Sequence, residues 1–222
     1  MSDVEKGVHN GGADNGGAGN ALTGATHATG VANPAALGLF SFASTTFILS
    51  LYNVSARGVS TPNVVVGMAL FTGGLAQLLA GMWEFPRGNV FGATAFTSYG
   101  AFWLSFAAIL IPSTGIQSAY ASTTEFENAL GIYLMTWFII TFLLFIASIR
   151  KSIAFMALFG FLSITFILLG AGALTGVTSV TTGGGAFGIV TALIAYYIGL
   201  SDLLAAERAA VVGLPTGGFK YD

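Results

Sequence analysis

The sequence has few charged residues for its length: Asp, Glu, Lys and Arg make up 7% of 222 residues, whereas 55% are hydrophobic. A soluble domain usually carries about 25% charged residues. A domain of this size must also leave much of its surface exposed, so a large core cannot hide the apolar excess. The shortage of charge excludes a water-soluble globular protein and indicates a chain that lies in lipid.

The sequence contains no cysteine, so it forms no disulfide, no cysteine-ligated metal site and no thiol catalyst. Both histidines, His9 and His27, precede the first apolar segment, which excludes a histidine proton relay inside the membrane. Phosphate-loop, GxSxG and HExxH motifs are also missing. We therefore predict no metal, no cofactor and no enzyme activity. The net charge of −2 gives no reason to expect nucleic-acid binding.

Six apolar segments alternate with short polar breaks, and a helix needs about 20 residues to cross the hydrocarbon layer. We therefore predict an all-α membrane protein with six transmembrane helices around a central pathway. Residues 33–204 form this transport domain, 205–222 a cytoplasmic C-terminal tail, and 1–32, rich in Gly, Ala, Asn and Thr, a disordered cytoplasmic tail. The predicted spans are 36–53, 63–83, 90–111, 129–149, 152–173 and 183–203.

Basic residues are distributed unevenly over the breaks between these spans. If the N-terminus lies inside, the outer loops contain only one basic residue, Arg57. Because basic residues favour the cytoplasmic side, this asymmetry predicts a protein of the cell membrane with both termini in the cytoplasm. The basic residues predicted on the inner side are Lys6, Arg87, Arg150, Lys151, Arg208 and Lys220.

Two helix starts face the predicted inner side. The first span opens with Asn33 followed by Pro34, and the third opens with Gly88 followed by Asn89. The free amides and positive dipole end of a helix start attract anions. Every helix start also needs a cap, so simple capping explains the same residues equally well.

The second span carries polar groups beside a row of glycines. Gly67, Gly74 and Gly81 are seven residues apart and predict a seam where helices approach closely. Gln77, near the middle of the span, is costly in lipid and is predicted to line a pore or to bond a neighbouring helix. Glu84, an acid at the end of the span, either carries a proton or pairs with Arg87.

Hydroxyl groups recur along one side of the third span, where Tyr99 offers both a ring and an OH. Such hydroxyls either replace the water shell of a small solute or bond back to their own helix. A similar segment occurs twice, at 42–49 and 161–168, with six of eight residues the same, which suggests that spans one and five share an axis. The polar residues predicted to line the pathway are Asn33, Thr46, Gln77, Thr94, Thr97 and Ser98.

Three longer runs resemble a known family. Residues 33–39, Asn-Pro-Ala-Ala-Leu-Gly-Leu, resemble the NPAPLGL signature of the acetate uptake transporter family, which includes bacterial succinate–acetate permeases and fungal acetate permeases. Residues 73–81 and 83–103 resemble its next two blocks in the same order and spacing. The chain departs from the family at Ala36, which replaces a proline, and at Val90, where the family often has threonine.

The resemblance implies six helices per subunit and a ring-shaped homo-oligomer, a hexamer, with one pathway in each subunit. It also implies passage of acetate and, in some members, succinate. In the family an apolar constriction is formed by a phenylalanine, a tyrosine and a leucine, which match Phe42, Tyr99 and Leu162.

The leading hypothesis from the sequence is therefore passage of acetate and other small monocarboxylates, by proton symport or as an anion channel. A membrane sensor or scaffold that does not transport, and an exporter of another small solute such as ammonia, are the alternatives. Altered flux after shortening Phe42 or Tyr99 separates a route from a scaffold, and competition by acetate but not by ammonium separates the two solutes.

Overall fold

Helices account for most of the computed structural model, which describes residues 30–207 and 209–219. Six of its helical segments are long and apolar enough to span a membrane, and the described residues form no β-strand. The predicted fold class is confirmed. The spans are α1 (Ala35–Asn53), α2 (Val65–Leu70) continued by η2 (Phe71–Ala76) and α3 (Gln77–Glu84), α4 (Val90–Leu110), α5 (Thr123–Ser148), α6 (Ile153–Thr175) and α7 (Thr178–Ala206).

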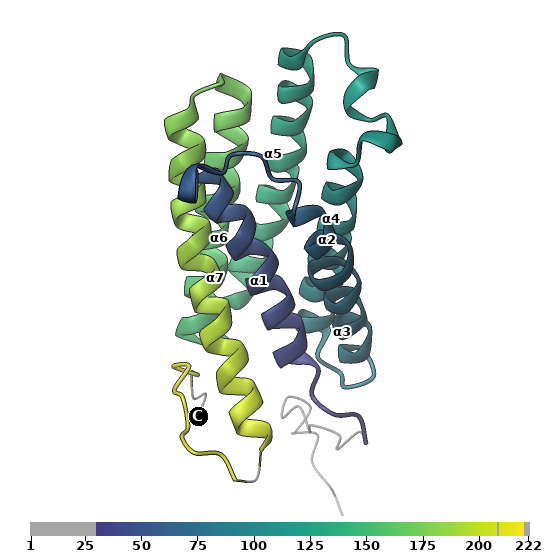
Figure 1. Ribbon diagram of the computed structural model, residues 1–222. Coiled ribbons are helices and arrows are strands. Elements are labelled where there is room, and N and C mark those ends of the chain that lie inside the picture. The colour runs from purple at the N-terminus through teal and green to yellow at the C-terminus, as the bar shows by residue number, and fades with distance from the viewer. Residues whose placement is uncertain (1–29, 208, 220–222) are drawn as a thin grey trace, which may run out of the picture.

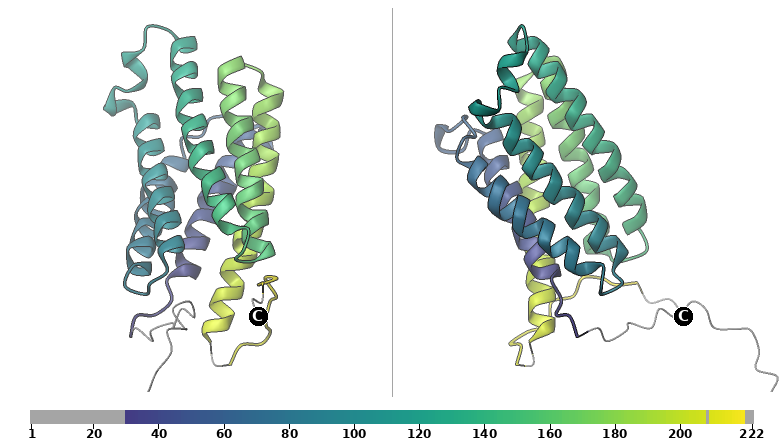
Figure 2. Two further views of the ribbon diagram at one scale, coloured as in Figure 1. Left: turned by 180° about the vertical axis from the view of Figure 1, so that it is seen from behind. Right: turned by 90° about the vertical axis from the view of Figure 1, so that its right-hand side faces the viewer.

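The six spans run up and down along one bundle (Figure 1). α1 packs along α7, α6 packs between α5 and α7, and α3 packs against α4. The start of α1, the α3–α4 loop, the α5–α6 loop and the C-terminal segment lie at one end, and the α4–α5 connection projects at the other (Figure 2). Arg87, Arg150 and Lys151 therefore share one end, as the sequence predicts. Lys6, Arg208, Lys220 and most of the predicted N-terminal tail lie outside the described residues.

Two helices begin earlier than hydropathy predicts. α5 begins at Thr123 rather than at residue 129, because the Ser122 side chain caps its first turn. The Ser122 hydroxyl accepts a hydrogen bond from the Glu125 amide, and the Glu125 carboxylate accepts one from the Ala121 amide. α7 begins at Thr178 rather than at residue 183, because Gly176, with φ of 67°, turns the chain within two residues.

The second span contains a π-helical turn, η2, which changes the predicted glycine seam. Gly74 and Gly81 are buried and closely packed, but Gly67 is exposed, and a methyl group added there would meet nothing within 4 Å. The seven-residue spacing assumes a continuous α-helix, and the wider π turn shifts the register between Gly67 and Gly74. Within one chain the predicted seam therefore does not extend to Gly67.

The end of the chain folds back onto the bundle. The Ile153 and Ala154 amides, which open α6, donate to the carbonyls of Gly217 and Thr216 at 3.0 and 3.1 Å. The Tyr197 and Ser201 hydroxyls of α7 donate to the carbonyls of Pro215 and Leu214. We call residues 213–218 the C-terminal strap.

Gly81 tests the close packing of α3 on α4. A methyl group at Gly81 would lie 2.5 Å from the Thr97 backbone nitrogen, which cannot move aside cheaply. We expect Gly81→Ala to lower the free energy of unfolding by about 1–3 kcal/mol, as overpacking does. Gly67→Ala, the matched control, should be neutral or gain up to about 1 kcal/mol from helix propensity. Equal thermal midpoints for the two variants in detergent would contradict this packing.

Candidate functional site

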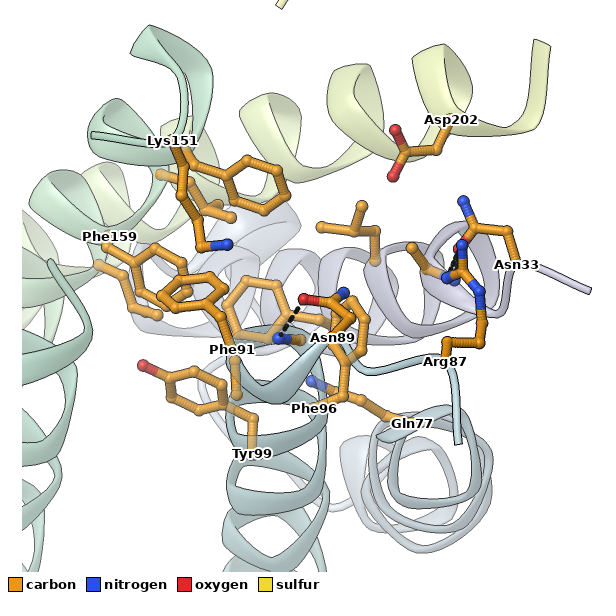
Figure 3. A pocket seen from close by; sticks show the side chains of 18 of the residues that line it. Asn33, Gln77, Arg87, Asn89, Phe91, Phe96, Tyr99, Lys151, Phe159 and Asp202 are labelled. Atoms are coloured by element: carbon orange, nitrogen blue, oxygen red, sulfur yellow. Dashed lines mark hydrogen bonds between the residues drawn. The ribbon is translucent and has the colours of Figure 1, made fainter. Parts of the chain in front are cut away.

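A cavity of about 390 Å³ opens at the end of the bundle where α1 begins. Its walls come from α1, α4 and α6, and its mouth from the α3–α4 loop, the α5–α6 loop and α7 (Figure 3). The mouth is polar, and the deeper part is apolar apart from Gln77. The deeper lining residues are Leu39, Phe42, Gln77, Phe91, Ala95, Phe96, Tyr99, Phe155, Leu158, Phe159 and Leu162.

The three residues predicted to form a constriction all line this cavity. Phe42, Tyr99 and Leu162 are each at most 5% exposed and come from α1, α4 and α6. The Phe42 and Tyr99 rings are 5.4 Å apart between centroids, a tilted aromatic pair. Phe42 and Leu162, from the two similar segments, thus meet at one cavity.

The Tyr99 hydroxyl is hydrogen-bonded to α5 rather than directed into the cavity. Tyr99 Oη and Thr141 Oγ1 are 2.8 Å apart, and Thr141 Oγ1 lies 2.7 Å from the Trp137 carbonyl. Because the single Thr141 hydroxyl hydrogen is donated to that carbonyl, Tyr99 donates to Thr141. Tyr99 therefore presents its ring to the cavity, and the hydroxyl that the sequence offered to a solute is used within the bundle.

A charged cluster joins the ends of two helices at the mouth. Arg87 Nη1 donates to Glu84 Oε2 at 2.9 Å and to Asn33 Oδ1 at 2.6 Å. The Glu84 side chain is fully buried and that of Arg87 is 27% exposed. The pairing of Glu84 with Arg87 expected from the sequence is present, and Glu84 itself does not line the cavity.

Both predicted helix caps form at this mouth. Asn33 Oδ1 accepts from the Ala35 amide at the start of α1, and Asn89 Oδ1 accepts from the Gly92 amide at the start of α4. Asn33 and Asn89 also line the cavity. Asn33 and Asn89 therefore both cap a helix and line the cavity, two roles that the sequence alone does not separate.

Gln77 projects from α3 behind Phe96 (Figure 3). It is fully buried and lines the cavity, and neither its Oε1 nor its Nε2 has a hydrogen-bond partner among the described residues. An unpartnered buried amide costs about 1–3 kcal/mol, so a polar ligand beside it would gain a partner already in place.

The hydroxyl residues predicted for the pathway are not among those that line the cavity. Thr94 is exposed and donates to the Val90 carbonyl of its own helix at 2.8 Å, the competing fate noted above. Thr97 packs against Gly81, and Ser98 is half-buried away from the cavity. Thr46 is buried one helical turn beyond Phe42, with its hydroxyl unpartnered. The face of α4 on the cavity is aromatic and small instead.

Two charged residues at the mouth were not predicted from the sequence as part of the site. Lys151 and Asp202 line the cavity and point into it from opposite sides (Figure 3). The Lys151 Nζ lies 4.5 Å from the centroid of the Phe91 ring. Burial lowers the pKa of the Lys151 ammonium, and the nearby Glu84 carboxylate acts against this. Asp202 is the one acid inside a predicted span, a signal that alone marks a functional candidate.

The described residues thus form a multi-pass membrane bundle with a cavity that is polar at its mouth and closed by aromatic and aliphatic side chains. The chain belongs to the GPR1/FUN34/yaaH family, which it matches over residues 16–217. The family resemblance drawn from the sequence is thereby confirmed.

Curated relatives and a solved structure agree with this assignment. The chain is 36% identical to the succinate-acetate/proton symporter SatP of Escherichia coli over 192 residues, 85% of this chain and 97% of SatP. It is 46% identical to ammonia transport outward protein 2 of Saccharomyces cerevisiae over 185 residues, 83% of this chain. The chain spans 66% of the length of this yeast protein and 65% of the length of a second Saccharomyces cerevisiae relative, accumulation of dyads protein 2. The solved structure of the bacterial acetate channel SatP matches with a TM-score of 0.74 and 34% identity, covering 83% of this chain and 99% of that one.

Arg87 provides a test of the cluster at the mouth. Arg87→Gln leaves the Glu84 carboxylate buried without its partner, and we expect a loss of about 3–5 kcal/mol in the free energy of unfolding. The double variant Glu84→Gln with Arg87→Gln removes both charges and should be more stable than Arg87→Gln alone. Thermal unfolding in detergent measures both, and a double variant no more stable than the single one would contradict the ion pair's role.

Proposed function

We propose that this chain carries acetate, and with it other small carboxylates, across the membrane through the cavity and past Phe42, Tyr99 and Leu162. The observation that carries the proposal is the order of the lining: cationic and amide groups at the mouth, then an apolar ring. The names of SatP, a symporter and an acetate channel, support the choice of solute.

Acetate fits both parts of this lining. Its carboxylate can accept from Lys151, Asn89 and the unpartnered Gln77 amide, while its methyl group contacts the aromatic wall. Lys151 and Arg87 lie at the mouth rather than deep in the bundle. Contact with neutral donors further inside keeps binding weak enough for release, as rapid passage requires.

The proposal extends to the assembly and its setting. The chain forms a ring-shaped hexamer in the cell membrane, with one pathway in each subunit and with the cavity mouth and both termini in the cytoplasm. The excess of basic residues at the mouth supports this orientation.

Flux of labelled acetate into liposomes tests the function, with and without an imposed pH gradient. We expect saturable uptake above that of empty liposomes, which corrects for acetic acid that crosses lipid unaided. Dependence on the pH gradient would assign symport, and a current independent of it would assign a channel. Uptake equal to that of empty liposomes would overturn the proposal.

Export of ammonia is a second candidate, favoured by the name of the yeast relative. The same liposomes distinguish the two solutes, because acetate passage predicts competition by unlabelled acetate or propionate and none by ammonium. Competition by ammonium alone would favour the second candidate.

Shortening Leu162 should relax the size limit of the pathway. Leu162→Ala removes a side chain that is 3% exposed at the ring, and we expect the ratio of butyrate to acetate flux to rise roughly tenfold. Leu134→Ala, a buried leucine of α5 that does not line the cavity, is the matched control and should leave the ratio unchanged. A Leu162→Ala variant that still rejects butyrate would contradict the constriction.

Gln77 should contribute to flux rather than to stability. Gln77→Leu keeps the volume and removes an amide without a partner, so the thermal midpoint should stay the same or rise. We expect acetate flux to fall about fivefold, equivalent to about 1 kcal/mol for a lost hydrogen bond. Unchanged flux would assign Gln77 to packing.

A further inference from the structure

Asp202 brings a carboxylate to the mouth of a cavity that otherwise offers donors and cations. It lies in the penultimate turn of α7, half-buried, and points between Lys151 on one side and Arg87 with Asn33 on the other (Figure 3). No described residue forms a hydrogen bond or ion pair with its carboxylate. A half-buried acid without a partner has no structural task that the bundle requires.

The charges at the mouth balance only when Asp202 is ionised. Arg87 is paired with Glu84 and bonded to Asn33, so these two charges offset each other. Lys151 and Asp202 are the remaining charges that line the cavity. An ionised Asp202 therefore brings the net charge of the mouth to zero and repels an entering carboxylate.

From this arrangement we infer that Asp202 is a proton-binding residue that couples carboxylate binding to proton uptake at the cavity mouth. When Asp202 takes a proton from solution, the charged groups at the mouth gain one net positive charge. A carboxylate anion then enters and restores neutrality, so one anion and one proton occupy the mouth together. On release, the proton returns from Asp202 to solution. This inference rests on the proposed function and assigns a residue to its proton-linked form.

The groups that act on Asp202 are few. Glu84 and Arg87 interact with it electrostatically from the α3 end, with opposite signs, and Lys151 faces it from the α5–α6 loop. α1, α6 and the C-terminal strap contribute no charged side chain to this end. As pH rises, Asp202 loses its proton while Lys151 and Arg87 stay charged, so carboxylate binding weakens as pH rises.

Acetate binding to the purified full chain, followed by NMR with ¹³C-acetate between about pH 5.5 and 8, tests the inference, because acetate is an anion throughout this range. In the unaltered chain, affinity should fall by up to about tenfold per pH unit above the titration of Asp202. Asp202→Asn should bind acetate with nearly constant affinity, at the level that the unaltered chain reaches at low pH. Asp202→Glu, which keeps a carboxylate at this position, should retain the pH dependence of acetate binding.

Glu207→Gln is the matched control, since Glu207 is exposed at the end of the same helix and does not line the cavity. It should keep the unaltered pH profile. If the unaltered chain binds acetate and Asp202→Asn keeps the same pH dependence, the inference is overturned and the proposed function stands. If no chain binds or moves acetate, the proposed function itself fails.

Discussion

The hydrogen bonds of Arg87 determine where this cavity opens. One guanidinium nitrogen reaches both the fully buried Glu84 at the end of α3 and Asn33 at the start of α1. Asn33 also caps α1, so a single side chain ties the first turn of one span to the last turn of another. A buried carboxylate with one oxygen paired cannot leave this arrangement without a large desolvation cost. The Arg87 contacts therefore hold the start of α1 beside the end of α3 at the mouth.

Deeper in the bundle the cost of burying polar groups without partners produces an apolar wall. Lipid offers no hydrogen-bond partners, so polar groups between the spans bond to protein wherever they can. The Tyr99 hydroxyl reaches Thr141, and Thr94 bonds to its own helix, which leaves rings and aliphatic groups facing the cavity. The cavity wall at Phe42, Tyr99 and Leu162 is therefore apolar. Among the residues that line the deeper cavity, Gln77 differs, since its amide lies there without a partner.

Much of this organisation follows from the sequence. Hydropathy predicts the six spans, the caps at Asn33 and Asn89 follow from residue type, and the family resemblance brings Phe42, Tyr99 and Leu162 to one cavity. The errors have physical causes. The π turn at 71–76 shifts Gly67 out of the predicted seam within the chain, and the N-cap at Ser122 extends α5 beyond its apolar part. Hydroxyl spacing cannot distinguish a pore-facing threonine from one bonded to its own carbonyls. Lys151 and Asp202 are far apart in the sequence, and only the fold brings both to one cavity.

The C-terminal strap affects which helix starts have free amides near the cavity mouth. The opening amides of α6 lie beside Lys151 and would themselves form an attractive landing place for a carboxylate. They are already occupied by the carbonyls of Thr216 and Gly217. The C-terminal strap thus occupies two of the amides at the start of α6 in place of a solute. The starts of α1 and α4, which both border the entrance, are instead capped by the single side chains Asn33 and Asn89.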